Sequence, residues 1–337
     1  MIHHPVAGGL PLLSYVEFVF VVILVMQVWL YQTLYINRYG RSRAIDVAGL
    51  LISMYAMTYL ANHINTTWSL TFRPFNTAVL LIIAGLLVQY MAGSCQHPLH
   101  DRDVRSFIIT LTFEFIAVLA GLLIGYHGGI YLCILGGLIG FLMPLLFYRS
   151  FQPDKVNFPH FVERVGLIII ITYGEMVVNI TRYFTGSLFQ PVALMMFVLL
   201  AAMFGTYVIQ SDRLINHHQR SRGFILMYSH VFMVVALLSF TAGLDYLADQ
   251  AVSRIFLWAF LAISFLVNTI CVLANGAYNR RHYKLHLNSY LWLGLAMIVG
   301  LVFALIARDT NLGLVTGFVL ASLGQCGYLL NYSRTRR

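Results

Sequence analysis

Charged residues are scarce in this chain of 337 residues, since only 10% are Asp, Glu, Lys or Arg whereas 60% are apolar. A soluble globular protein has about 25% charged and about 45–50% apolar residues, so this composition excludes a soluble enzyme. Cysteine is also scarce: Cys95, Cys133, Cys271 and Cys326 form no Cys-x-x-Cys pair, which argues against a disulfide or zinc framework. The GxSxG, HExxH, P-loop and GxGxxG signatures are missing as well. We therefore lean against an enzyme and expect no cofactor and no metal.

Apolar runs of about 20 residues, each long enough to cross a hydrocarbon core about 30 Å thick, recur along the whole chain. The predicted spans cover residues 12–36, 43–62, 75–94, 106–125, 129–148, 161–182, 191–210, 223–243, 252–275, 286–307 and 311–331. All connecting loops are short. The sequence therefore predicts an all-α integral membrane protein, a bundle of about 11 transmembrane helices, with residues 1–337 forming a single transmembrane domain and no extramembrane domain.

Basic residues alternate between the two sets of loops. One set holds 16 of them: Arg38, Arg41, Arg43, Arg102, Arg105, Arg149, Lys155, Arg213, Arg220, Arg222, Arg280, Arg281, Lys284, Arg334, Arg336 and Arg337. The other set holds 4, namely Arg73, Arg182, Arg254 and Arg308. Because cytoplasmic loops retain Lys and Arg, we expect the N-terminus outside and the C-terminus in the cytoplasm. Orientation also explains the net charge of +9, so we expect no nucleic-acid partner.

A few ionisable residues lie inside the predicted spans, where a charge is costly unless it meets a partner or water. Glu17 and Glu175 fall at similar depth in the outer half, and Glu114 and His230 form an inner layer. Asp46 lies near the inner interface, within reach of a neighbouring Arg. The candidates for a transport pathway or a buried polar cluster are Glu17, Glu114, Glu163, Arg164, Thr172, Glu175, Asn179, Arg182 and His230.

The sixth span carries a polar stripe on an Ile-rich helix. At about 100° per residue, five polar side chains fall within a quarter of its circumference: Arg164, Thr172, Glu175, Asn179 and Arg182. This face is predicted to meet something polar. The alternative is that these groups pair with one another and hold the helices in register.

The fourth span shows a face of small and polar residues at helical spacing, made of Thr110, Glu114, Ala117, Gly121 and Gly125. Such a face suits close contact with another helix. In the preceding loop, His97-x-x-His100-Asp101 has the spacing of metal ligands on a helical turn, but Pro98 favours a solvated loop.

The first and sixth spans begin alike, with SYVEFVFVVILV at 14–25 and HFVERVGLIIII at 160–171. Five helices separate these starts, so a duplication would place the two halves in opposite orientation. The hypothesis is a 5+5 inverted repeat with the eleventh helix added, an arrangement known among secondary transporters. Chance alignment of apolar segments is the alternative.

The stretch HFVERVGLIIIITYGEMVV at 160–178 resembles the signature of the low-temperature-requirement protein A (LtrA) family. The residues that carry this resemblance are Glu163, Arg164, Gly166, Gly174 and Glu175. Three further segments are similar to that family: VEFVFVVILVMQ at 16–27, YINRYGRSRAIDVAGLLISMYAM at 35–57 and YSHVFMVVALLSFTAGL at 228–244. The resemblance implies a multi-pass protein of the bacterial cytoplasmic (inner) membrane, and it supplies no reaction or substrate.

Two positions depart from the family pattern. Glu17-Phe18-Val19-Phe20 is followed by Val21, where relatives commonly have Asp, so a role that needs two carboxylates on this helix is in doubt. Met176 stands where many relatives have a small hydroxyl residue.

The leading functional hypothesis is a transporter or channel for an ion or small polar solute, with proton coupling as one form of it. Glu17, Glu114 and Glu175 would line the route, because intramembrane carboxylates mark ion pathways. The expected partners are the lipid bilayer and an unidentified ion or small solute. The oligomeric state stays open.

Two other classes of function compete with transport. One is a membrane sensor or scaffold. The other is a membrane-embedded enzyme or lipid-handling protein whose inner-face groups would meet a lipid headgroup, namely Arg38, Asp46, His160, Glu163 and Arg164.

Overall fold

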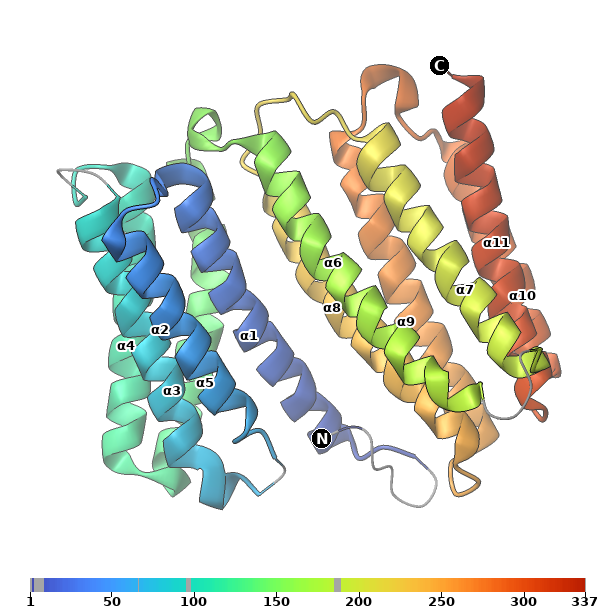
Figure 1. The fold of residues 1–337 in the computed structure, drawn as a ribbon, viewed down its shortest axis with the longest axis horizontal. Helices are drawn as coiled ribbons and strands as arrows, with labels where there is room; N and C mark the ends of the chain where they lie inside the picture. The colour runs from blue at the N-terminus through green and yellow to red at the C-terminus, as the bar shows by residue number, and fades with distance from the viewer. Residues whose placement is uncertain (1, 3–8, 66, 95–97, 185–188, 337) are drawn as a thin grey trace. The chain divides into compact units, whose positions relative to one another are not determined.

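The computed structural model describes residues 2, 9–65, 67–94, 98–184 and 189–336. Within these residues the chain folds into eleven α-helices and divides into two compact units (Figure 1). The first unit comprises Val16–Phe161 and Arg220–Gly223. The second comprises Ile2–Tyr15, Val162–Gln219 and Phe224–Arg337. We refer to them as unit 1 and unit 2.

Unit 1 contains α1 (Leu12–Tyr39) from Val16 onward, together with α2 (Ala44–Ala61), α3 (Trp68–Val88), α4 (Arg102–Ile124) and α5 (Tyr126–Leu146). Unit 2 contains α6 (Phe158–Ile180) from Val162 onward, together with α7 (Pro191–Val208), α8 (Phe224–Asp245), α9 (Arg254–Ala274), α10 (Leu287–Ile306) and α11 (Asn311–Thr335). Two of them continue into π-helical segments, α3 into η1 (Gln89–Gly93) and α7 into η5 (Ile209–Leu214). The all-helical prediction is confirmed for the described residues.

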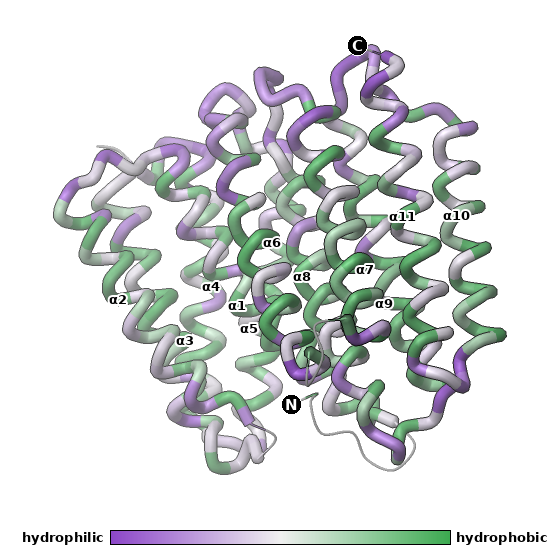
Figure 2. Tube along the Cα trace, turned by 45° about the vertical axis from the view of Figure 1, so that its right-hand side comes forward, coloured by the Kyte–Doolittle hydropathy of each residue, from purple (hydrophilic) through white to green (hydrophobic). Residues whose placement is uncertain are grey.

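Ten of the eleven helices are long and apolar enough to cross a membrane. The remaining helix, α6, is the polar one: every stretch of 18 of its residues contains Glu163, Arg164 and Glu175. Apolar residues run along the helices and hydrophilic residues gather at their ends (Figure 2). This distribution is that of a bundle built for a bilayer.

The prediction was wrong about the start of the third span. This helix begins at Trp68 rather than at residue 75, so Arg73 lies on α3 and not in a loop. Pro74 lies inside the helix. A proline removes a single helical N–H, and neighbouring groups in a membrane bundle satisfy the freed carbonyl.

The face of α4 that carries small residues packs against α5, in agreement with the helix contact that its spacing predicts. A Cβ added at Gly121 would lie 2.6 Å from the Cys133 Sγ and 2.7 Å from the Gly129 carbonyl oxygen. No side chain fits there, which lets the two backbones approach closely. Further along the pair, a Cβ at Gly136 would lie 3.3 Å from the Cβ of Ala117.

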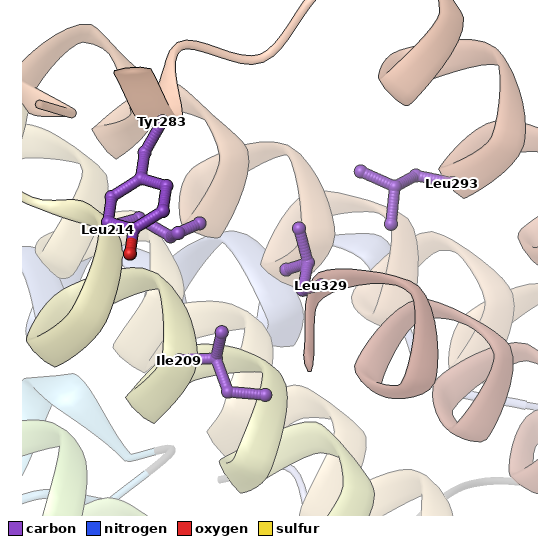
Figure 3. Close-up of a cluster of buried hydrophobic side chains, with 5 residues drawn as sticks. All are labelled: Ile209, Leu214, Tyr283, Leu293 and Leu329. Atoms are coloured by element: carbon purple, nitrogen blue, oxygen red, sulfur yellow. The ribbon is translucent and has the colours of Figure 1, made fainter. Parts of the chain in front are cut away.

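Within unit 2, an apolar cluster fixes the position of η5. Its members are Ile209, Leu214, Tyr283, Leu293 and Leu329 (Figure 3). Ile209 and Leu214 are the two ends of η5, and an antiparallel bridge joins the next residue, Ile215, to Asn279. The segment that carries Gln210, Ser211 and Asp212 is therefore held at both ends.

The repeat hypothesis stays a prediction. The two glutamates that it aligns, Glu17 and Glu163, are each the sixth residue of a helix, α1 and α6 respectively.

Candidate functional site

Glu114 lies in the interior of unit 1, where α1, α4 and α5 meet. Its side chain is 1% exposed, and the Gln27 amide nitrogen donates to both carboxylate oxygens, at 2.9 Å and 2.8 Å. The Tyr31 hydroxyl donates to the carbonyl of Gly140 on α5. A Cβ at Gly140 would overlap both the Gln27 amide and the Glu114 carboxylate. Glycine at this position therefore makes room for the pair.

The charge of Glu114 has no basic counterpart among the ion pairs of the described residues. The Gln27 carbonyl oxygen is also buried without a hydrogen-bond partner there. An isolated carboxylate is costly in a low-dielectric interior. Glu114 is therefore suited to hold a proton or to bind a cation that comes from outside the chain.

The charged groups near the C-terminal end of α1 have partners within the protein. The Arg38 guanidinium donates to Asp103 at 2.8 Å, and the side chains of this ion pair are 1% and 0% exposed. Arg38 also lies over the rings of Phe107 and Phe151, with 5.7 Å and 5.4 Å from its Cζ to the ring centroids. This geometry describes a buried structural ion pair.

Asp46 is similarly occupied. It accepts the Tyr35 hydroxyl at 2.6 Å and the backbone N–H groups of Arg41 and Arg43 at 3.0 Å each. The Arg43 side chain completes the pair, as the sequence predicts for a neighbouring Arg. Two of the groups considered for a lipid headgroup, Arg38 and Asp46, are thus engaged by the protein itself.

Asp101 caps the first turn of α4 through the N–H groups of Asp103 and Val104. Burial acts to raise its pKa, but the Lys155 ammonium at 2.5 Å and these N–H groups outweigh burial, so the pKa lies below its usual value. The His-x-x-His hypothesis rests on His97, which lies outside the described residues, as does Cys95. Of the other cysteines, Cys133, Cys271 and Cys326 are free thiols.

The polar stripe of α6 divides among different partners. Thr172 is buried and donates to the Ile168 carbonyl of its own helix at 2.8 Å. Arg182, beyond the end of α6, pairs with Asp245 of α8 and donates to the Asn179 carbonyl at 3.1 Å. Glu175 is exposed in the structure.

The structure gives the positions of the remaining candidate residues, but it does not bring them together in one site. Glu17 is half-buried on α1 in unit 1, whereas Glu175 lies in unit 2, so their shared depth stays a prediction. Arg164 is half-buried and Glu163 is exposed.

His230 lies in the interior of unit 2 and is 1% exposed. Its Nδ1 lies 2.7 Å from the Leu226 carbonyl, which can only accept, so Nδ1 carries the proton. Its Nε2 therefore accepts from the Tyr207 hydroxyl at 3.1 Å. Sequence reasoning missed Tyr207, because a tyrosine near a span end suggests a membrane-interface anchor.

Gln27 was also missed. The signal for it was an uncharged polar side chain ten residues after Glu17 in the same apolar helix. Read alone, that signal does not reveal a partner on another helix.

A bundle of apolar helices with a carboxyl group buried between them defines a polytopic α-helical membrane protein. Residues 1–324 match the family model described as bacterial low temperature requirement A protein (LtrA). The chain therefore belongs to the LtrA family, as the resemblance at 160–178 implies. Comparisons with curated proteins and with solved structures yield no match.

Proposed function

We propose that this protein is a transporter or channel for an ion or small polar solute, and that Glu114 couples transport to protons. The observation that carries the proposal is the buried Glu114 carboxyl, held by Gln27 and without a basic counterpart among the described residues. Intramembrane carboxyl groups of this kind mark ion and proton pathways in membrane proteins. A structural ion pair would instead resemble Arg38 and Asp103, in which both charges are matched.

We further propose that the protein lies in the bacterial cytoplasmic membrane with its N-terminus outside and its C-terminus in the cytoplasm. The 16 to 4 distribution of Lys and Arg between the two sets of helix ends and connecting loops supports this orientation.

The test reconstitutes the purified protein in liposomes that contain a pH-sensitive dye, with an imposed pH gradient and membrane potential. Glu114→Gln keeps the shape of a protonated carboxyl but cannot release a proton. We expect wild-type protein to conduct protons and Glu114→Gln to lose that flux. Asp309→Asn removes an exposed carboxylate beyond the end of α10 and serves as the matched control, with flux retained.

Equal flux in wild type and Glu114→Gln would show that Glu114 is not the coupling group. Glu175→Gln, measured in parallel, identifies the α6 carboxylate as the coupling group if only that variant loses flux. A wild-type protein that moves no protons under either gradient contradicts proton conduction as proposed.

A further inference from the structure

Unit 2 contains a cavity of about 390 Å³ beside α6, α7 and η5. This volume lies within the range of about 300–1,000 Å³ that is usual for small-molecule sites. The residues that line it are Val162, Glu163, Gly166, Leu167, Ile170, Tyr207, Val208, Ser211, Asp212 and His217.

The charge of the lining is opposite to that of the chain. The protein has a net charge of +9, yet the lining contains the two carboxylates of Glu163 and Asp212 and no Lys or Arg. Neither carboxylate belongs to an ion pair among the described residues. The cavity therefore favours a cation.

The polar atoms around the cavity are mainly hydrogen-bond acceptors. The Tyr207 hydroxyl proton is directed to His230 Nε2, so its oxygen is left to accept. His217 Nε2 lies 2.8 Å from the Ser211 carbonyl and donates to it, so this donor is already used within the chain. A ligand that matches this lining carries its own N–H donors.

A second, much smaller cavity adjoins the first and shares Val162, Tyr207 and Ser211 with it. Its volume of about 10 Å³ is at the lower limit of the space that can hold one water molecule. Gln210 lines it, is 1% exposed, and has a side-chain oxygen without a partner among the described groups. The Gln210 amide nitrogen is used by Asn279 at 2.6 Å. This buried acceptor independently points to a donor that comes from outside the chain.

A metal ion does not fit the cavity as well as an organic cation. Among the described residues, no group of three or more His, Cys, Asp and Glu side chains lies close enough to hold a metal. The wall of the cavity is apolar, formed in part by Leu167 and Ile170, which are 53% and 51% exposed. Such a wall suits a hydrocarbon body attached to the charge.

We propose that this cavity binds a primary organic ammonium ion. The ammonium group lies among the carboxylates of Glu163 and Asp212 and the hydroxyl oxygen of Tyr207. Its hydrocarbon body packs against Leu167 and Ile170. The inference that an ammonium ion is the transported solute rests on the proposed transport function. Binding of the ion to the cavity can be measured without transport.

The experiment measures binding by isothermal titration calorimetry with the full-length protein in lipid nanodiscs, and empty nanodiscs correct for partitioning of the probe into lipid. Three probes share one hydrocarbon body: phenethylammonium, its N,N,N-trimethyl derivative, which lacks N–H donors, and 3-phenylpropionate, which carries a negative charge. We expect phenethylammonium to bind, the trimethyl derivative to bind more weakly, and 3-phenylpropionate to give no heat above the empty nanodisc.

Two variants test the assigned charges. Glu163→Gln and Asp212→Asn should each weaken phenethylammonium binding about tenfold or more, because each removes a charged hydrogen-bond acceptor of the ammonium group. Asp309→Asn removes a carboxylate outside the cavity and should leave the affinity unchanged. Gly166→Leu retains both carboxylates but fills the cavity, and should abolish binding.

Several outcomes overturn the inference: no binding of phenethylammonium to the wild type, equal binding of 3-phenylpropionate, or wild-type affinity in both carboxylate variants. Loss of binding in Asp309→Asn would overturn it as well, because a remote charge would then account for the effect. The two proposals fail separately. Binding without proton flux contradicts the transport function alone, and proton flux through Glu114 without ammonium binding contradicts only this inference.

Discussion

Gly140 is the position at which a single methyl group tests the Glu114 site most directly. In Gly140→Ala the added Cβ overlaps the Gln27 amide and the Glu114 carboxylate, which are both buried. Overpacking a core costs about 1–3 kcal/mol. Separation of the two side chains also removes the buried hydrogen bond between them, worth about 0.5–1.5 kcal/mol when the carboxyl is protonated.

The usual gain from replacing glycine by alanine in a helix is small here. Transmembrane helices keep their backbone hydrogen bonds before they associate, so helix propensity contributes little to assembly of the bundle. We therefore expect Gly140→Ala to lower the free energy of unfolding by about 1.5–4.5 kcal/mol.

The assay is unfolding in mixed micelles as the mole fraction of sodium dodecyl sulfate is raised. Gly174→Ala is the matched control, because an added Cβ at Gly174 of α6 meets nothing within 4 Å. A double-mutant cycle with Gln27→Ala adds a second test: removal of the amide vacates the same space, so the two costs should not add. Equal stability of Gly140→Ala and Gly174→Ala would refute the packing argument.

Two further predictions concern the ion pairs of Asp103 with Arg38 and of Asp101 with Lys155 in unit 1. Arg38→Met leaves the buried Asp103 carboxylate without its counterion and should lower the free energy of unfolding by about 3–5 kcal/mol in the same assay. The double variant Arg38→Met with Asp103→Leu should recover most of that loss. A double variant as unstable as the single one would contradict this prediction. The lowered pKa of Asp101 stabilises the fold at neutral pH, and this contribution should disappear as the pH falls through the folded pKa, below about 4. Asp101→Asn retains an N-cap but cannot titrate, so the unfolding midpoint of this variant should fall less than that of the wild type as the pH is lowered from 7 to 2. An equal fall in both proteins would rule out Asp101 as a source of the acid sensitivity.

The helices could be predicted because length and hydropathy alone decide them. The predicted span at 252–275 is observed as α9, Arg254–Ala274. The predicted start at residue 75 follows the apolar run, whereas α3 extends back to Trp68 through Arg73 and Pro74, which hydropathy does not mark as part of a span.

The candidate site was predicted only in part. Glu114 and His230 were found because an ionisable group in an apolar span stands out. Their partners were not found, since Gln27 is 87 residues from Glu114 and Tyr207 is 23 residues from His230. Such contacts depend on how each helix is rotated about its axis, which hydropathy does not specify. The cavity beside α6 depends likewise on how neighbouring helices pack, and Gly166, which has no side chain, leaves space in its lining.

The use of counterions separates structural charges from candidate functional ones. Four acidic side chains of unit 1 have basic partners: Asp46 with Arg43, Asp101 with Lys155, Asp103 with Arg38, and Asp154 with Arg220. In unit 2, Asp245 pairs with Arg182. Among the described residues, Glu114, Glu163 and Asp212 belong to no ion pair, although the chain has 21 basic residues for 12 acidic ones. Because basic residues are in such excess, a carboxylate that lies in a bundle interior or a cavity and has no basic partner is suited to a partner from outside the chain. We assign a proton to Glu114 and an ammonium ion to the cavity beside α6.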